Sequence, residues 1–209
     1  LAMHLADIAG VPQKKSPKSA PVCHLTTTAV TALLAAPDPA TRTGLRDQFF
    51  MILMYDLAAR DAEMLALTVG DIDTQRRSAE LIGKGSKPRR LPITADTAMH
   101  FQRYVKTFHR DTNLGQPLFY TVHDHRKTPM SDDNVARFLR QHADTARQVC
   151  PDMPRKVHPH MLRHSRAIIA RLAAAQADLS ALADGTFGTL RVGTFQSVGS
   201  RLLTTISSK

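Results

Sequence analysis

The sequence predicts a mostly helical chain that carries one short β-hairpin. Helical hydrophobic patterns fill most of residues 26–172, whereas only residues 78–82 and 90–93 have the composition of strands. A hydrophobic share of 43% over 209 residues is typical of a globular protein and is enough for one sizeable core.

Three helices are expected before the hairpin. Residues 26–36 form a short helix, which a threonine at its start can cap. Residues 47–59 are apolar on nearly every face, and this is typical of a buried helix. Residues 61–67 form a third, short helix, and Gly70 suits its C-terminal end.

The tip of the hairpin and two further helices follow. Residues 83–89 are rich in glycine and lysine, as expected for a hairpin tip. Residues 94–108 form an amphipathic helix that opens on a threonine cap, and residues 109–128 are expected to be mostly loop. Residues 131–149 form another amphipathic helix, capped by a serine.

The two ends of the chain differ from its middle. Residues 12–21 are polar and basic with three prolines, which is the composition of a linker. Residues 1–20 are therefore expected to be the end of a truncated N-terminal domain with its linker, or else a plain disordered arm. Residues 21–177 are expected to form the main domain. Residues 178–209, rich in Gly, Ser and Thr, are expected to be an atypical, poorly specified tail.

The charge balance predicts a polyanionic partner. Lysine and arginine number 28 against 18 acidic residues, so the net charge is +10 and the pI is about 10.1. Such a charge favours nucleic acid before membrane. Cys23 and Cys150 are too far apart in sequence to suggest a disulfide scaffold, so a reduced, cytoplasmic protein is expected. No signal peptide is visible, and the apolar run at residues 49–55 is too short to cross a bilayer.

Residues 156–167 gather three histidines and three cationic side chains. Pro159 disfavours helix at the residue before it, so a last helix can begin near His160 and continue through residue 172. On that helix His160, Arg163 and His164 share one face, close to unpaired backbone N–H groups and the positive end of the dipole. Phosphate is the natural guest, but a solvated basic helix and a metal site stay open as alternatives. Zinc proteases with this histidine spacing have glutamate after the first histidine, where this chain has methionine.

Two more sites become informative when they are read in order with the histidines. Alone, Arg60 with Glu63 could be a structural ion pair, and Lys84 could be one exposed lysine in a turn. In order, the segments Leu-Ala-Ala-Arg60-Asp-Ala-Glu63, Ile-Gly-Lys84-Gly-Ser-Lys-Pro-Arg89 and His158-Pro-His160-Met-Leu-Arg163-His164-Ser resemble the tyrosine recombinase (phage integrase) family. The resemblance covers roughly residues 28–172, most of the catalytic domain of that family.

The resemblance implies a mostly helical α+β fold with a small antiparallel sheet beside the active site. Residues 1–20 would be the end of the core-binding domain and the linker, and residues 21–177 the catalytic domain. Enzymes of this family cut one DNA strand by attack of a tyrosine hydroxyl on a phosphodiester and then rejoin it. They need no metal or other cofactor, and their partner is double-stranded DNA.

The resemblance also implies roles for individual residues. Arg60 and Arg163 would grip the non-bridging phosphate oxygens. Lys84 would protonate the leaving 5′-oxygen, and His160 would hydrogen-bond the phosphate. Supporting residues would be Glu63 and His164, and candidate contacts to other DNA phosphates are Lys87, Arg89, Arg90, Arg155 and Lys156. The alternative for those five basic residues is a plain soluble surface.

The family pattern is interrupted after the last helix. A Leu-Gly-His element is expected about twenty-five residues beyond the His-x-x-Arg motif, with the nucleophilic tyrosine about nine residues later. Residues 184–189 instead read Asp-Gly-Thr-Phe-Gly-Thr, and the last tyrosine of the 209 residues is Tyr120. The break near residues 173–184 resembles a change of reading frame. Tyr55 in the buried helix, Tyr104 in the amphipathic one and Tyr120 in the loop are poor substitutes, because a hydroxyl must be held in place to react.

The sequence therefore predicts site-specific DNA recombination or integration by the tyrosine-recombinase mechanism, with this chain deficient in strand cleavage. An intact homologous recombinase subunit could supply the missing tyrosine. The alternative is a non-catalytic DNA-binding or regulatory remnant of an integrase.

Overall fold

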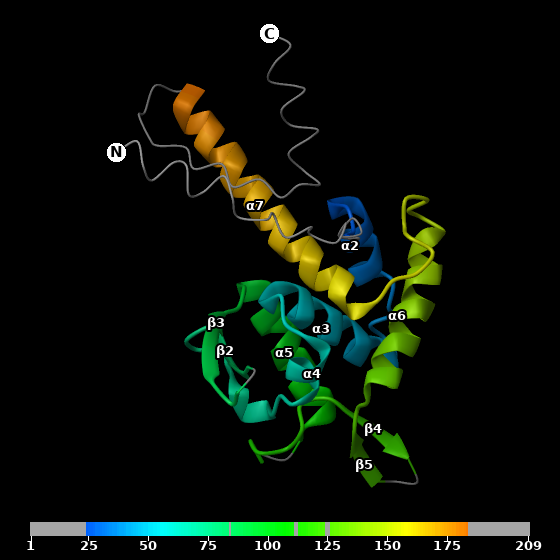
Figure 1. Ribbon diagram of the computed structural model, residues 1–209. Coiled ribbons are helices and arrows are strands. Elements are labelled where there is room, and N and C mark those ends of the chain that lie inside the picture. The colour runs from blue at the N-terminus through cyan, green and yellow to red at the C-terminus, as the bar shows by residue number, and fades with distance from the viewer. Residues whose placement is uncertain (1–23, 84, 111–112, 124–125, 184–209) are drawn as a thin grey trace, which may run out of the picture. The chain divides into compact units, whose positions relative to one another are not determined.

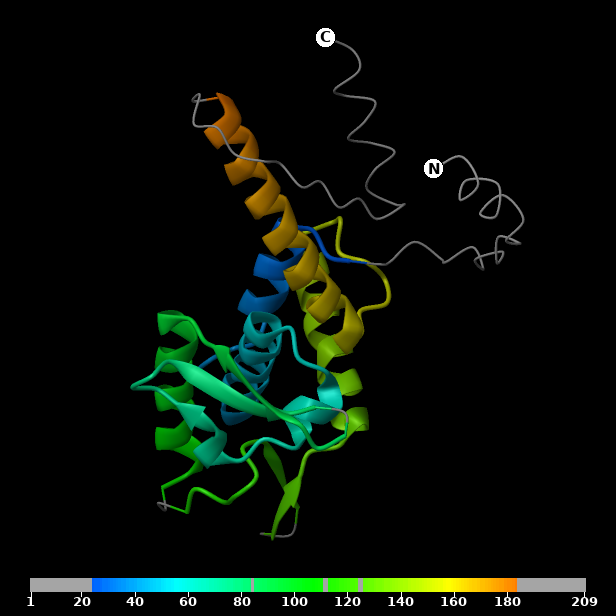
Figure 2. The ribbon, with the colours of Figure 1, turned by 60° about the vertical axis from the view of Figure 1, so that its left-hand side comes forward.

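The computed structural model describes residues 24–83, 85–110, 113–123 and 126–183 (Figures 1 and 2). In chain order the elements are α2 (Thr27–Ala35), α3 (Arg42–Leu57), α4 (Asp61–Leu65), the 3-10 helix η1 (Val69–Asp71), β1 (Ile72–Asp73), β2 (Ser78–Ile82), β3 (Pro88–Pro92), α5 (Ala95–Phe108), β4 (Tyr120–His123), β5 (Arg126–Pro129), α6 (Asp132–Arg147) and α7 (Pro159–Ala183). Helices predominate and the strands pair antiparallel, which confirms the mostly helical α+β class.

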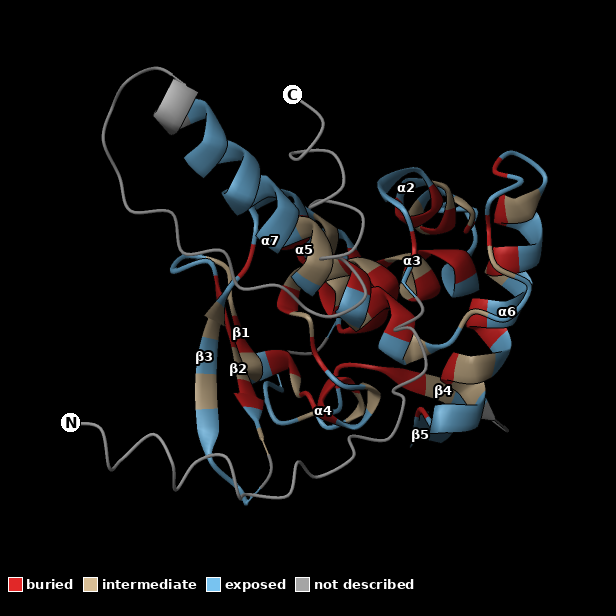
Figure 3. Cartoon of the chain, turned by 45° about the horizontal axis from the view of Figure 1, so that its top comes forward, coloured by how far each residue is buried: buried red, intermediate tan, exposed pale blue. Residues whose placement is uncertain are grey.

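Helix α3 is the centre of the core, as its nearly all-round apolar pattern predicted. Phe49, Phe50 and Met51 are fully buried (Figure 3). The ring of Phe50 meets that of Phe138 on α6 edge-on at 5.4 Å between centroids, and the ring of Phe49 lies 5.5 Å from that of Phe119. Helix α3 also contacts α2, α4, α5 and α7, so it sets the places of the helices that carry the candidate site.

Helix α3 begins at Arg42, so the start predicted at Asp47 was wrong. Thr41 forms the cap: its Oγ1 accepts from the Gly44 N–H at 3.0 Å, and its hydroxyl donates to the Asp38 carbonyl at 3.0 Å. A Cβ on Gly44 would lie 2.0 Å from the Asp38 carbonyl oxygen, so the turn requires glycine there. This first turn depends on a cap and a close backbone approach, and a search for apolar periodicity does not detect either.

The other predicted helices are present with small changes at their ends. Thr26 caps α2, Thr94 caps α5 and Ser131 caps α6, each by accepting a hydrogen bond from a backbone N–H of the first turn. Helix α4 ends at Leu65 without the help of Gly70, which lies instead in η1. The apolar side chains of α6 face the core as predicted, and they are Val135, Phe138 and Leu139.

The predicted hairpin is formed by β2 and β3, with Ser78 opposite Pro92 and Ile82 opposite Pro88. It belongs to a three-stranded sheet of order β1-β2-β3. Strand β1 has only two residues, too few for an alternating pattern, and the sequence analysis did not predict it.

The loop predicted for residues 109–128 was wrong in part, because β4 and β5 form a second hairpin there. The residues of β5 are all exposed, so the alternation of buried and exposed positions that identifies a strand is missing. Tyr120, expected in a loop, starts β4 and is buried, and its hydroxyl donates to the Phe108 carbonyl at 2.5 Å.

Helix α7 begins at Pro159, as the sequence predicted. It continues to Ala183, beyond residue 177, where the tail was expected to begin, and residues 170–180 are exposed (Figure 3). Near its start Ser165 is fully buried, and its Oγ accepts from the Leu25 N–H at 2.7 Å and donates to the Met161 carbonyl at 2.7 Å.

Some predictions concern residues outside the described part of the chain, namely residues 1–20, Cys23, Lys84 and residues 184–209. Cys150 is described, and it is buried with a free thiol. Within the described segments, no helix combines the length and the hydropathy that crossing a membrane requires.

Candidate active site

The N-terminus of α4 carries Arg60 and Glu63. Helix α3 ends in a left-handed residue, Ala58 (φ 46°), and Arg60 then takes the extended N-cap position of α4. The Glu63 side chain folds back, so its Oε2 accepts from the Arg60 backbone N–H at 2.8 Å and its Oε1 accepts from Arg60 Nη1 at 3.0 Å. The carboxylate thus caps α4 and complements the positive end of the helix dipole.

Arg89 of strand β3 forms a second ion pair with the same carboxylate. Its Nη1 donates to Glu63 Oε1 and its Nη2 to Glu63 Oε2, each at 2.8 Å. The Glu63 side chain is only 6% exposed. Burial by itself would raise the pKa of Glu63, but the hydrogen bonds from Arg89 and Arg60 outweigh burial and lower the pKa to about 2. Glu63 is therefore ionised at neutral pH and ties the sheet to α4.

This pKa predicts a pH-dependent contribution to stability. The folded pKa of about 2 lies below the ordinary value of 4.5, so Glu63 stabilises the fold above pH 4.5 and loses that effect as the pH falls toward 2. We expect Glu63→Gln to lower the free energy of unfolding by up to about 3 kcal/mol at pH 7, since one pKa unit corresponds to about 1.4 kcal/mol. The difference from wild type should shrink between pH 4.5 and 2 in urea unfolding. The control Glu80→Gln removes an exposed carboxylate and should have a small effect at every pH.

One carboxylate faces two guanidinium groups, so the cluster keeps a net positive charge. The Arg60 side chain is 49% exposed, and only its Nη1 donates a hydrogen bond to Glu63. With half of the side chain exposed, its other guanidinium N–H groups can reach an anion.

The first turns of α7 bring the three predicted histidines together. The ring centroids of His158 and His160 are 6.3 Å apart, and those of His160 and His164 are 6.4 Å apart. Partial desolvation lowers the pKa of His158, and the positive charge that His160 and His164 carry when protonated lowers it further. His158 is therefore neutral at pH 7.

Arg163 follows two buried residues in the second turn of α7. Its neighbours Met161 and Leu162 are buried, which fixes the orientation of this face of α7. Arg163 Nη1 is buried, and among the described residues it has no hydrogen-bond partner. A buried guanidinium nitrogen without an acceptor is unfavourable by itself and becomes favourable when an anion supplies the acceptor.

The helix that carries Arg60 and Glu63 and the helix that carries Arg163 share neighbours. Helices α4 and α7 both pack against α3 and α6. Within the described residues, no hydrogen bond or ion pair joins Arg163 to the Glu63 cluster. A bound group that touched both sets would connect them.

The hairpin turn that bears the predicted lysine is described on both sides of position 84. The Gly83 N–H donates to the Lys87 carbonyl at 2.9 Å, and Gly85 has φ +78°, a conformation that glycine adopts without strain. Lys84 itself lies outside the described residues, so its predicted role stays a prediction.

The other predicted DNA-contacting residues differ in what they touch. Lys87, Arg155 and Lys156 are exposed. Arg90 donates to exposed Glu80 at 3.0 Å, whereas Arg89 is bound to Glu63. Among the residues with described positions, no group of three or more His, Cys, Asp or Glu side chains could hold a metal ion.

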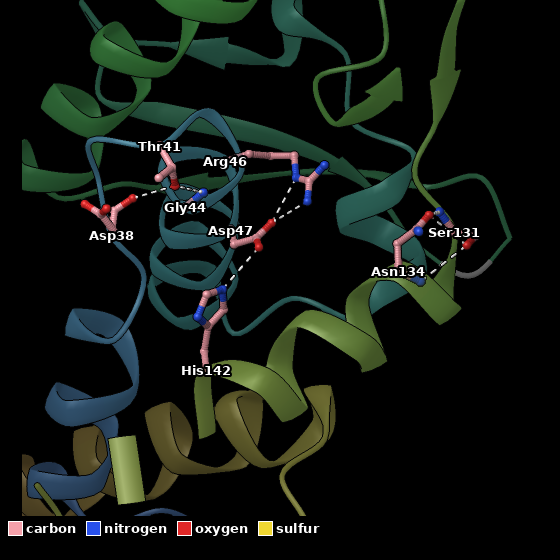
Figure 4. Close-up of polar contacts among 8 residues, drawn as sticks. All are labelled: Asp38, Thr41, Gly44, Arg46, Asp47, Ser131, Asn134 and His142. Carbon is pink, nitrogen blue, oxygen red and sulfur yellow. Dashed lines mark hydrogen bonds and ion pairs between the residues drawn. The ribbon is translucent and has the colours of Figure 1, made fainter. Parts of the chain in front are cut away.

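The sequence analysis did not single out one buried charge network, shown in Figure 4. Asp47 Oδ1 accepts from Arg46 Nε at 2.9 Å and from Arg46 Nη2 at 2.7 Å. Asp47 Oδ2 lies 3.1 Å from His142 Nε2 of α6. The network joins α3 to α6. Its signal in the sequence was a pair of adjacent charged residues, Arg46 and Asp47, close before the apolar run of α3.

Comparison with known proteins agrees with this arrangement. The Phage integrase family model matches residues 24–185. The tyrosine recombinase XerC of Myxococcus xanthus is 33% identical over 164 residues, which cover 75% of this chain and 51% of that protein. The tyrosine recombinase XerD of Xanthomonas campestris pv. campestris is 34% identical over 160 residues, covering 72% and 47%. The chain thus spans about half the length of these curated relatives.

Solved structures show the same fold at lower identity. The crystal structure of XerA recombinase aligns with a TM-score of 0.65 and 18% identity, covering 94% of this chain and 68% of that one. XerH site-specific recombinase bound to its difH substrate in a pre-cleavage complex aligns with a TM-score of 0.55 and 18% identity, covering 76% and 45%. With the fold, the family match and the XerC and XerD relatives in agreement, the chain belongs to the phage integrase family.

Proposed function

We propose that this chain is a DNA-binding recombinase catalytic domain, whose site grips one backbone phosphate of duplex DNA for site-specific recombination or integration. The observation that carries the proposal is the buried Nη1 of Arg163, near the start of α7, which has no hydrogen-bond partner within the described segments. A phosphodiester oxygen would supply the missing acceptor, and the positive end of the α7 dipole favours the same anion.

The remaining residues extend this grip. Arg60 has a half-exposed side chain, so it can approach a second non-bridging oxygen. His160, exposed on the same helix as Arg163, can donate a hydrogen bond to the phosphate. Lys84 completes the proposed set as the acid that protonates the leaving 5′-oxygen, and glycines on both sides of it would permit a close approach to the backbone.

We also infer that the chain does not cleave DNA by itself. The hydroxyl of buried Tyr104 donates to the Leu118 carbonyl at 2.8 Å, and that of buried Tyr120 is bound to the Phe108 carbonyl. Burial raises the pKa of Tyr55, so its hydroxyl is harder to ionise than that of a free tyrosine. All three are therefore poorly suited to attack a phosphorus atom, and XerC- or XerD-like subunits could provide the nucleophile.

Replacement of Arg163 tests whether this residue binds a DNA phosphate. We expect Arg163→Ala to weaken binding to a short duplex by about tenfold or more, because hydrogen bonds to charged groups contribute about 1.5–3 kcal/mol. The slope of log affinity against log salt should fall by about 0.9 in magnitude, the value for one lost phosphate contact. Fluorescence anisotropy over a salt series measures both quantities.

Lys106→Ala is the matched control, because it removes one exposed positive charge from α5 and should change affinity little. Urea unfolding verifies that Arg163→Ala is folded, and its free energy of unfolding should not fall, since Arg163 Nη1 has no hydrogen-bond partner in the part of the chain that the structure describes. Unchanged affinity and slope in folded Arg163→Ala would mean that the site does not hold a phosphate.

A further inference from the structure

The Glu63 carboxylate has no free hydrogen-bonding capacity. Oε1 accepts from Arg60 Nη1 at 3.0 Å and from Arg89 Nη1 at 2.8 Å, while Oε2 accepts from the Arg60 backbone N–H and from Arg89 Nη2, both at 2.8 Å. A carboxylate offers about four acceptor positions, so all of them are in use.

Because the acceptor positions of Glu63 are all occupied, Arg60 cannot form a second side-chain hydrogen bond to it. Arg89 takes both carboxylate oxygens with its two terminal nitrogens, the most favourable geometry between an arginine and a carboxylate. Arg60 is left with a single side-chain bond to Glu63 and stays 49% exposed. Without Arg89, the carboxylate could rotate to accept two nitrogens of Arg60, three residues away on the same helix turn, and that guanidinium would turn inward.

The β2–β3 hairpin places Arg89 beside Glu63. Arg89 and Leu81 are paired positions of β3 and β2, and Leu81 is fully buried, which fixes the strand against the core. A Cβ on Gly83 would lie 3.1 Å from Arg89 Nη1, so glycine at this position leaves room for the guanidinium. The bidentate contact therefore depends on the register of the sheet.

We propose that Arg89 is a positioning residue: by occupying Glu63 it keeps the guanidinium of Arg60 available to a DNA phosphate. This role rests on the proposed function of Arg60 and replaces the direct phosphate contact predicted for Arg89 from the sequence. Arg90, the next residue on β3, has no such role, because successive residues of a strand point to opposite faces of the sheet and the carboxylate that Arg90 pairs with is Glu80 on β2.

A double-mutant cycle on DNA binding tests the proposal. Arg60→Ala, Arg89→Gln and the double variant are compared with wild type on a short duplex over a salt series. Each single variant should lower the magnitude of the salt slope by about 0.9, the value for one phosphate contact, and the double variant should lose no more than either single one. The matched control is Arg90→Gln, whose effect on slope should add to that of Arg60→Ala.

The outcomes separate three roles for Arg89. A double variant that loses about twice the slope, close to 1.8, would show that Arg89 contacts a phosphate itself, and would overturn the proposal. A lower free energy of unfolding for Arg89→Gln with an unchanged slope would show a purely structural bridge, and would overturn it as well.

A measurement without DNA keeps this proposal distinct from the proposed function. NMR of the arginine guanidinium groups reports rotation about the Cζ–Nε bond, which two hydrogen bonds to one carboxylate slow down. We expect this rotation of Arg60 to be faster in wild type, where one side-chain hydrogen bond restrains it, than in Arg89→Gln, where two would. If Arg60→Ala leaves DNA binding unchanged, Arg60 does not have its proposed function of contacting a phosphate. The NMR comparison of wild type with Arg89→Gln then decides by itself whether Arg89 positions Arg60. An Arg60 signal that is identical in both proteins would exclude that role.

Discussion

A nicked suicide duplex is expected to give no covalent adduct with this chain. Such a substrate loses a short fragment after cleavage and so traps any phosphotyrosine. Tyr104 and Tyr120 are buried with their hydroxyls bound to backbone carbonyls, and Tyr55 has a raised pKa. Duplexes are first selected for tight binding from a random pool, and the nick is then placed at each position in turn. A denaturing gel and mass spectrometry detect the adduct.

The control is a mixture with an intact recombinase of the XerC or XerD type that has its own tyrosine. We expect any adduct in that mixture to have the mass of the intact subunit only. An adduct with the mass of this chain, mapped to one of its three tyrosines, would show that one of its own tyrosines can attack DNA. Such an adduct would leave the proposal that Arg163 and Arg60 bind DNA untouched, because DNA binding is measured separately.

The largest loss of stability is expected from Asp47→Asn. The Asp47 side chain is 7% exposed and neutralises Arg46, whose own side chain is 13% exposed. Removing one partner of a buried ion pair leaves an uncompensated charge, which typically costs about 3–5 kcal/mol. Urea unfolding at pH 7 measures the change in the free energy of unfolding.

The double variant Arg46→Met/Asp47→Asn gives this prediction a second, independent result. Methionine removes the guanidinium that Asp47→Asn leaves unpaired, so the double variant should be more stable than Asp47→Asn alone. Asp96→Asn, which changes an exposed carboxylate on α5, is the control and should change stability by about 0.5 kcal/mol or less. If the double variant loses as much free energy of unfolding as Arg46→Met and Asp47→Asn lose together, the Arg46 and Asp47 charges are not coupled.

The sequence was sufficient to predict the elements with strong local signals. Thr94 and Ser131 cap α5 and α6, Pro159 starts α7, and the limits of β2 agree with the prediction, because each depends on residues close in sequence. The start of α3 depends on the Gly44 approach to Asp38, a backbone contact that hydrophobic periodicity does not encode.

The β4–β5 hairpin was missed for a different reason. Its buried anchor, Tyr120, is at the start of β4, and the residues of β5 are exposed and polar. Pairing there depends on contacts with α5, such as the Tyr120 hydroxyl bond to Phe108, which become visible only when the chain is folded.

The candidate site residues were predicted one by one from the resemblance of the motifs, which grouped Arg60, Glu63 and Arg163, and their role in binding DNA stays a prediction. The hydrogen-bond network around them was not predicted. The pairing of Arg89 with Glu63 was not predictable, because it joins residues 26 positions apart through the register of the sheet. Arg89 therefore resembled an ordinary surface cation in the sequence.

The buried hydroxyl of Ser165 has a mechanical consequence. One hydrogen bond of 2.7 Å fastens the Leu25 amide to the helical turn that also holds Arg163. Because Ser165 and Arg163 lie on the same turn of α7, a displacement of Leu25 would reach, through one serine side chain, the arginine that we propose binds phosphate.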